Sequence, residues 1–351
     1  MKDNIFSYGF VNKNLISKLN KQILTTLAKQ INRETLIVDT TWLYTPVNIR
    51  HLFNKLNQPY TNILLYSGPD SCPVGGPYFY LEKILKEAYT VYDVGNYYGL
   101  NYFSFWLEYL RTNLHLFTSF NTFELSTNLK TYMCLNRKPH RHRVDLGNKL
   151  YSNRLLRKGF FSFGDSSSVD YKPKFKTPYL LQNDIVDESG NLDHCGPIEY
   201  GMSNNINSLG LKENWNNHFL NVVTETLTSS PGFISEKTFK PIVGRRPFVV
   251  LGDEYVYKIL HSWGIDTFDD ILGTGYLQKS SKDREDWIVN TILNLEKEKN
   301  LNKLLLDLKP RLENNFENLK IAMIDNKRKI ETGLDIPLCH ANFSEKFSRL
   351  I

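Results

Sequence analysis

The stretch 232–252, GFISEKTFKPIVGRRPFVVLG, combines a helix signal with a strand signal. Ser235 has the chemistry of a helix N-cap, and apolar residues at positions 239, 242 and 243 form a stripe at helical spacing. We therefore predict a short helix over 235–243, which Pro241 shortens or kinks because it lacks an amide hydrogen. The run PFVVLG (247–252) predicts a buried strand. Ionic residues nevertheless lie beside this core, at Glu236, Lys237, Lys240, Arg245 and Arg246.

The position of the predicted helix explains why ionic residues are tolerated there. A strand is predicted over 219–226, so the helix N-terminus would point its amides out of the strand edge, where phosphate binds. In open parallel sheets the ligand crevice lies at that edge. Glu236 could accept hydrogen bonds from the vicinal hydroxyls of a ribose, and Lys237 could neutralise a diphosphate. The alternative is an ordinary solvated surface helix. We expect Arg245 and Arg246 to form a solvated turn.

Strand and helix signals alternate along the rest of the chain. Short apolar runs predict strands over 35–40, 62–67, 90–95, 131–136 and 160–164. Helical spacing predicts helices over 47–57, 78–89, 101–114, 139–159, 255–264 and within 281–298 and 301–326, whereas 165–215 is rich in loop signals. Strands separated by helices indicate parallel βαβ units. We predict an α/β protein with two Rossmann-like domains facing a cleft, over 1–125 and 126–330, and a tail (331–351) that crosses back to the first domain.

Composition restricts the class of protein. The net charge of +6 and a pI near 8.9 favour anionic partners such as nucleic acid, nucleotides or phosphorylated glycans. Four cysteines without CxxC spacing indicate reduced thiols, and neither Cys339-His340 nor the pair His140/His142 completes a zinc site, so no metal is predicted. The sequence has no apolar run of about 18 residues and no signal peptide, which predicts a cytoplasmic protein without a membrane span.

The order of residues over 219–275 resembles the donor-binding segment of GT-B glycosyltransferases. It is closest to the α1,3-fucosyltransferase-like group, with its S-E-K…G-x-x-P pattern, and is similar to glycosyltransferase-like proteins of large tailed phages, where TETL…FISEKTFKPI…PFVVLG is typical. The resemblance implies that Ser235, Glu236 and Lys237 belong to a nucleotide-sugar site, with Glu236 on the ribose and Lys237 on the phosphates. The fucosyltransferases usually have Tyr where this chain has Phe233, so the nucleotide, UDP or GDP, stays open.

A second resemblance lies about 95 residues upstream. The run YMCLNRKPHRHRVDLGNKL (132–150) is similar to the first strand of a GT-B C-terminal domain and its arginine-bearing helix. The resemblance implies that Arg143 binds the pyrophosphate, with Arg137 and Arg141 as the other candidates. Arginine suits this role because its planar fork binds phosphate oxygens bidentately and stays charged. The alternative is a solvated basic helix face.

The N-terminal half carries a weaker signal. In GT-B enzymes this domain receives the acceptor and, in inverting members, supplies a general base. Asp39, Asp70 and Asp93 each follow or end a predicted strand. We favour Asp70, in the loop SGPDSCPVGG, as the base, although Asp in a Gly-Pro turn is usually only a turn residue.

These resemblances imply a metal-independent glycosyltransferase that needs no cofactor and uses a nucleotide sugar as co-substrate. The favoured acceptor is a hydroxymethylated base in phage DNA, which would place the protein in the host cytoplasm. The alternatives are transfer to a surface glycan or lipid-linked saccharide, and a non-catalytic nucleic-acid-binding or virion protein that kept the fold. Other enzyme classes lack support, because the sequence contains no GxxxxGK[ST] loop, no GxSxG elbow and no DxD pair after a strand.

Overall fold

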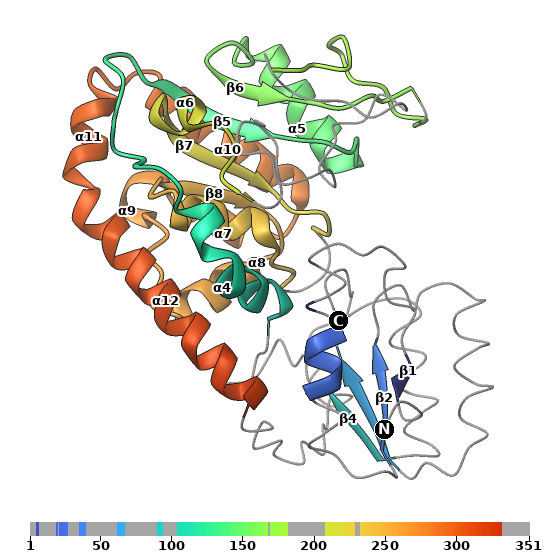
Figure 1. The fold of residues 1–351 in the computed structure, drawn as a ribbon. Coiled ribbons are helices and arrows are strands. Elements are labelled where there is room, and N and C mark those ends of the chain that lie inside the picture. The colour runs from blue at the N-terminus through green and yellow to red at the C-terminus, as the bar shows by residue number, and fades with distance from the viewer. Residues whose placement is uncertain are drawn as a thin grey trace. The chain divides into compact units, whose positions relative to one another are not determined.

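The structure is a computed structural model that describes residues 5–6, 19, 21–26, 35–39, 62–66, 90–93, 104–167, 169–181, 208–228 and 232–331 (Figure 1). The chain divides into two compact units. Unit 1 comprises Met1–Tyr109 and Ala322–Ile351, and unit 2 comprises Leu110–Ile321. The domain boundary predicted near residue 125 and the crossing of the tail over 331–351 stay predictions.

Unit 1 contains a parallel sheet of four strands in the order β1-β2-β3-β4. The strands are β1 (Ile5–Phe6), β2 (Thr35–Asp39), β3 (Asn62–Tyr66) and β4 (Thr90–Asp93). The predictions of β2, β3 and β4 are confirmed. The helices predicted over 47–57 and 78–89 lie outside the described residues, and so does Asp70.

Unit 2 contains a second parallel sheet, in the order β6-β5-β7-β8. Its strands are β5 (Lys130–Leu135), β6 (Gly159–Ser162), β7 (His218–Thr224) and β8 (Phe248–Leu251). From β5 the chain proceeds to β6 on one side and later to β7 on the other. The strand order therefore reverses between β5 and β7. In open α/β sheets a ligand crevice lies at the carboxyl ends of the strands where this reversal occurs.

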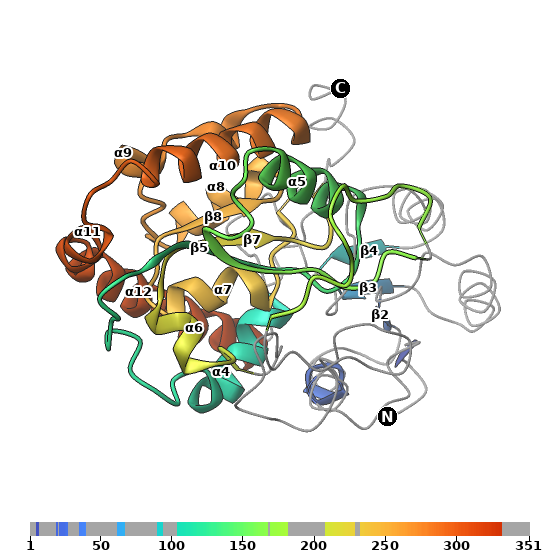
Figure 2. The same ribbon diagram turned by 90° about the horizontal axis from the view of Figure 1, so that it is seen from above.

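Helices cover both faces of the second sheet. In Figure 2, α5 (Arg141–Ser152) and α10 (Ser281–Leu295) lie on one face, and α6 (Lys212–Asn216) and α7 (Glu236–Val243) lie on the other. The remaining elements are α4 (Phe105–Phe117), α8 (Glu254–Ser262), α9 (Asp269–Leu272), the 3-10 helix η1 (Gly275–Leu277), α11 (Leu301–Asp307) and α12 (Lys309–Glu331). None of the described helices has the length and apolar character that crossing a membrane requires. The protein is thus α/β, as predicted.

Helix α7 has the features that its sequence predicts. Ser235 is its N-cap, and the side chains of Phe239, Ile242 and Val243 are at most 1% exposed. Two other helices differ from the prediction. The helix predicted over 139–159 ends at Ser152, because residues 153–158 form turns in which Arg154 has a φ of 60°. The helix predicted within 301–326 is divided into α11 and α12, since Pro310 lacks the amide that a continuous helix needs.

The prediction that Arg245 and Arg246 form a solvated turn is wrong for Arg246. Arg245 does have the φ of 51° that a turn requires, but Arg246 is completely buried. Its guanidinium donates hydrogen bonds to backbone carbonyls, including Thr122 (2.6 Å) and His218 (2.9 Å). The planar fork of arginine has five donors, and carbonyls from several segments converge on it here. Burial is therefore possible without a carboxylate partner.

Cys134 is the one cysteine among the described residues, and it is a buried free thiol, as predicted. Burial raises its pKa to about 12. A buried thiol with so high a pKa is protonated and unreactive at neutral pH.

Candidate functional site

A buried carboxylate fixes the first turn of α7 to the end of β7. Glu225 follows β7 directly and is fully buried. It accepts hydrogen bonds from the amide and the hydroxyl of Ser235 (3.0 and 2.6 Å) and from the hydroxyl of Thr238 (2.7 Å). Ser235 was predicted as the helix cap and, from the resemblance, as part of a nucleotide-sugar site, whereas Glu225 was not predicted at all; the structure shows the Ser235 amide and hydroxyl bonded to Glu225. The sequence did contain a signal for this contact. A carboxylate, Glu225, lies at the end of a predicted strand, and two hydroxyl side chains, Ser235 and Thr238, lie three residues apart at the start of the next predicted helix.

Glu236 and Lys237 form a half-buried ion pair at the N-terminus of α7. Lys237 Nζ donates to Glu236 Oε1 (2.9 Å) and to Ser235 Oγ (3.1 Å). The side chain of Glu236 is 6% exposed, and among the described residues its Oε2 has no hydrogen-bond partner. Burial alone would raise the pKa of Glu236, but Lys237 and Lys240 outweigh burial and hold the pKa below its ordinary value. Glu236 Oε2 is therefore a buried, charged oxygen without a hydrogen-bond partner in the described part of the chain.

The amides of α7 are less available than the sequence suggested. The amide of Ser235 donates to Glu225, and those of Lys237 and Thr238 donate to the Ser235 hydroxyl (3.4 Å) and carbonyl (3.2 Å). A phosphate at this helix N-terminus would therefore have to be bound mainly by side chains.

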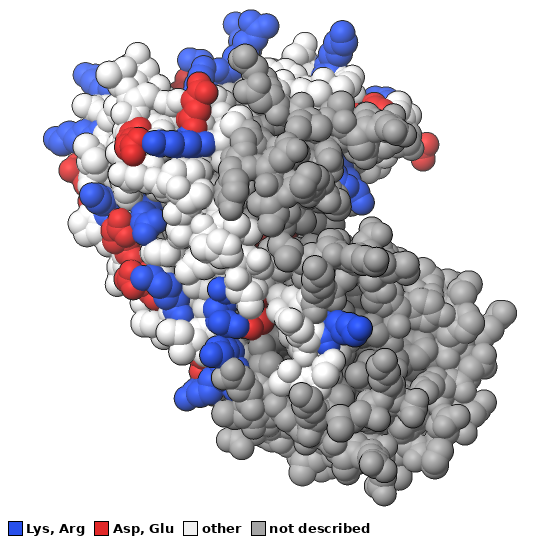
Figure 3. All heavy atoms as spheres, viewed as in Figure 1, with Lys and Arg blue, Asp and Glu red and all other residues white. Residues whose placement is uncertain are grey.

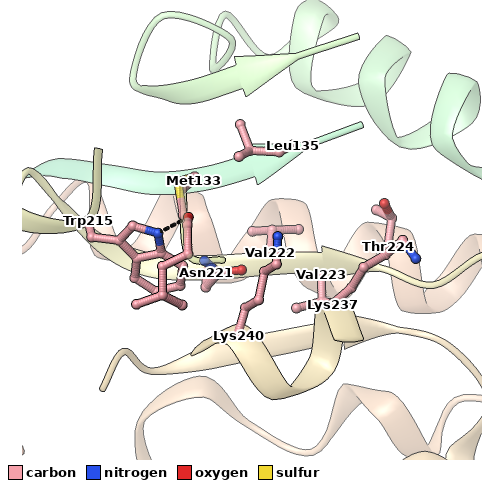
Figure 4. A pocket seen from close by; sticks show the side chains of 10 residues that line it. Met133, Leu135, Trp215, Asn221, Val222, Val223, Thr224, Lys237 and Lys240 are labelled. Atoms are coloured by element: carbon pink, nitrogen blue, oxygen red, sulfur yellow. Dashed lines mark hydrogen bonds between the residues drawn. The ribbon is translucent and has the colours of Figure 1, made fainter. Parts of the chain in front are cut away.

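Lys240 and Lys237 line a small cavity between α7 and the sheet (Figure 4). The cavity measures about 50 Å³ and is also lined by Met133, Trp215 and Asn221. Figure 4 shows both lysines extending from α7 toward β5 and β7. Burial lowers the pKa of Lys240 to about 8, although Glu236 opposes this shift. The space accommodates water-sized groups.

Arg143 approaches the same edge of the sheet from α5. It is 4% exposed, and it donates to the carbonyls of Thr224 (2.9 Å) and Lys138 (3.2 Å). Its Nε has no hydrogen-bond partner among the described residues. Burial lowers the pKa of Arg143 to about 10 against the opposing charge of Glu225, so the group stays charged at neutral pH. Arg143 thus connects the β5–α5 loop to the end of β7.

The two other predicted arginines differ from Arg143 in their environment. Arg141 is on the outer surface, where its side chain is 71% exposed and pairs with Asp145 at 3.1 Å. Arg137 is half-buried in the loop after β5. Phe233, which precedes α7, is buried at 4% exposure.

Histidine adds no charge to this edge. His142 Nε2 lies 2.8 Å from the carbonyl of Glu225, and burial together with Arg143 lowers the pKa of His142 to about 3. Burial and the same arginine lower the pKa of His140 to about 4. Both imidazoles are therefore neutral at pH 7.

The carboxyl ends of β5 and β7 thus bring together Arg143, Lys237 and Lys240 with Glu225 and Glu236. No group of three or more His, Cys, Asp or Glu side chains arranged to hold a metal ion occurs in the described part of the chain. No protein-family model matches the chain, and neither a curated protein nor a solved structure matches it.

Proposed function

We propose that the protein is a metal-independent glycosyltransferase of the GT-B class, with two Rossmann-like domains facing a cleft. The single observation that carries this proposal is the buried, charged Glu236 beside Lys237, at the point where the strand order reverses. A crevice at such a point is the usual ligand site of an open α/β sheet. The free Oε2 of Glu236 suits the hydroxyls of a nucleotide ribose, and the neighbouring cations suit its diphosphate.

The proposed reaction moves a sugar from a nucleotide sugar to an acceptor hydroxyl. The bond between the anomeric carbon and the terminal phosphate oxygen breaks, and the acceptor oxygen bonds to that carbon. The acceptor proton goes to a base, for which Asp70 is the sequence candidate. Lys237 has three protons and uses two on Ser235 and Glu236, which leaves one for a phosphate oxygen. Charges already in place around the leaving diphosphate are a dominant source of catalysis.

Arg143 has two roles in this proposal. Its hydrogen bonds to Thr224 and Lys138 hold the ends of β7 and of the β5–α5 loop together. Its remaining N–H groups would face the diphosphate from the side opposite α7. The first role is structural and the second electrostatic, so a substitution there affects both.

Calorimetry with UDP and GDP tests the donor site. We expect micromolar affinity for one of the two nucleotides, and a marked loss of that affinity in Glu236→Gln. This variant keeps the shape of the side chain and removes its charge. If neither nucleotide binds, the proposal is wrong and the alternative of a non-catalytic protein gains support.

Two acceptors fit this proposal, namely a hydroxymethylated base in DNA and a surface or lipid-linked saccharide. Mass spectrometry of nucleosides from hydroxymethylated DNA, incubated with the protein and a panel of nucleotide sugars, separates them. A hexose or pentose mass shift supports the DNA acceptor. Transfer to a saccharide alone, with unmodified nucleosides, supports the other.

A further inference from the structure

Positive charge is concentrated in one part of unit 2. Residues 137–176 contain eleven Lys and Arg but only three Asp and no Glu, a net charge of +8, whereas the whole chain carries +6. The remainder of the chain is therefore slightly acidic. In Figure 3 blue side chains predominate over the part of the surface around β6, while blue and red alternate along α12. This asymmetry is the electrostatic signature of a polyanion-binding face.

Part of this charge surrounds a cleft between α5 and α10. The cleft measures about 660 Å³, and its lining residues are all polar or charged. Arg141, Lys149, Lys174 and Lys282 line it together with Asp145 and Glu285. Lys149 is neutralised by ion pairs with Glu285 and Asp286, and Arg141 pairs with Asp145. Lys174 and Lys282 are exposed and form no ion pair with any described residue, so their charges remain available.

The segment 171–176, YKPKFK, extends this charge in a fixed position. Its three lysines, Lys172, Lys174 and Lys176, are exposed, while Phe175 between them is buried. The ring of Phe175 packs so closely on α5 that a Cβ at Gly147 would lie 2.9 Å from it. The amide of Lys174 also donates to the side chain of Asn148 on α5 (2.6 Å). The lysines therefore extend from a segment that is anchored to α5.

An exposed aromatic side chain adjoins these lysines. Tyr151 is 49% exposed on α5, one turn beyond Asn148, which lines the cleft. Its ring centroid lies 6.3 Å from that of Phe175. An aromatic platform beside a row of cations is the arrangement by which proteins bind single strands without reading their sequence, because every base can stack and every nucleotide carries a phosphate.

We propose that this basic face, formed by Lys174, Lys176 and Lys282 with Tyr151, binds the sugar-phosphate backbone and bases of single-stranded nucleic acid. Lys174 and Lys282 contact phosphates in the cleft, Lys176 contacts a phosphate beside it, and Tyr151 stacks on one base. This binding requires neither a nucleotide sugar nor glycosyl transfer. It is therefore independent of the proposed function, and it would also position a nucleic-acid acceptor near the ends of β5 and β7.

Fluorescence anisotropy with a labelled oligothymidylate of about 12 nucleotides tests the electrostatic part. The test variant combines Lys174→Glu, Lys176→Glu and Lys282→Glu. The matched control combines Lys297→Glu, Lys299→Glu and Lys303→Glu, three exposed lysines after α10 and on α11. We expect the test variant to bind roughly a hundredfold more weakly at low salt, with a log–log salt slope smaller by about 2, and the control to bind like wild type. No wild-type binding, or equal weakening in both variants, overturns the proposal.

Tyr151→Ala and Tyr151→Phe test the stacking part. We expect Ala to weaken binding of the oligothymidylate roughly tenfold and Phe to leave it unchanged. With an abasic strand of the same length, wild type and Tyr151→Ala should bind equally. In a duplex the bases stack on each other and cannot reach Tyr151. An equal effect of Tyr151→Ala on abasic, single and double strands would therefore overturn the assignment to single strands.

The two proposals fail in different experiments. Calorimetry with UDP and GDP uses no nucleic acid, and the three lysine substitutions should leave nucleotide affinity unchanged. Strand binding without nucleotide binding would contradict only the glycosyltransferase proposal. Nucleotide binding without strand binding would contradict only the proposal that the basic face binds single-stranded nucleic acid.

Discussion

The hydroxyl of Ser235 donates to the carboxylate of Glu225 at 2.6 Å, and this hydrogen bond ties the first turn of α7 to the end of β7. Both residues are buried, so neither can replace its partner with water. The ionic pair Glu236–Lys237 follows directly on this anchor. The position of the candidate site therefore depends on a hydrogen bond that contributes no group to the ligand.

Ser235→Ala should destabilise the protein by about 1–3 kcal/mol, because it leaves a buried carboxylate oxygen without its donor. Urea unfolding measures the change. Ser280→Ala is the matched control, since Ser280 caps α10 through the amide of Asp283 but is exposed. We expect that substitution to cost about 1 kcal/mol or less. Equal losses in the two variants would show that the buried network adds nothing beyond an ordinary cap.

Lys237→Ala should lower turnover of the nucleotide sugar by roughly a hundredfold or more, as expected for the loss of one charge-stabilising donor. Glu236→Ala should instead mainly raise the donor KM, because the ribose contact is similar in the ground and transition states. Steady-state kinetics with varied donor separates the two effects. A variant that is folded and retains full kcat and KM would show that the residue lies outside the site.

Arg143→Ala should reduce both turnover and stability, because Arg143 also holds Thr224 and Lys138. Arg143→Lys keeps the charge but not the fork, so it should restore part of the turnover and little of the stability. Thermal unfolding and kinetics on the same samples measure both. Loss of stability without loss of turnover would assign Arg143 a structural role only.

Much of this arrangement could be predicted from local sequence. The apolar stripe of α7, its N-cap and the run of β8 depend on residues within a few positions of each other, and all three are confirmed. The burial of Glu225 and of Arg246 could not be predicted, because it depends on partners that the chain brings from elsewhere. A carboxylate after a strand and an Arg pair after Gly244 are both typical of solvated turns. Only the folded chain places Thr122 and His218 around Arg246.

Lys240 should make stability depend on pH above neutrality. Burial lowers its pKa from an ordinary value of 10.5 to about 8, so between these values the unfolded chain binds a proton that the folded chain has released. Stability contributed by this residue therefore rises as pH increases from about 8 to 10.5. The free energy of unfolding of wild type, relative to that of Lys240→Met, should therefore increase over that range. A constant difference between pH 7 and pH 10 would contradict the lowered pKa.

The buried guanidinium of Arg246 should contribute much more to stability than the partly exposed guanidinium of its neighbour, Arg245. Arg246→Met should destabilise the protein by about 3 kcal/mol or more, because carbonyls of Thr122, Trp215 and His218 each lose a donor in a buried environment. Removing a buried charge offsets part of this loss. The cost should therefore fall short of the sum of three separate hydrogen bonds.

Arg245→Met provides the comparison, since Arg245 is adjacent in sequence but partly exposed. Its pair with Glu313 (2.8 Å) has side chains 21% and 42% exposed, and such pairs contribute about 0–1 kcal/mol. The free energies of unfolding of the two variants, measured in urea, should therefore differ by at least about 2 kcal/mol. Because the guanidinium of Arg246 joins segments that precede β5 and β7, its loss should also increase hydrogen exchange at Thr122 and Trp215. Equal unfolding midpoints would mean that Arg246 is solvated after all, as its sequence alone suggests.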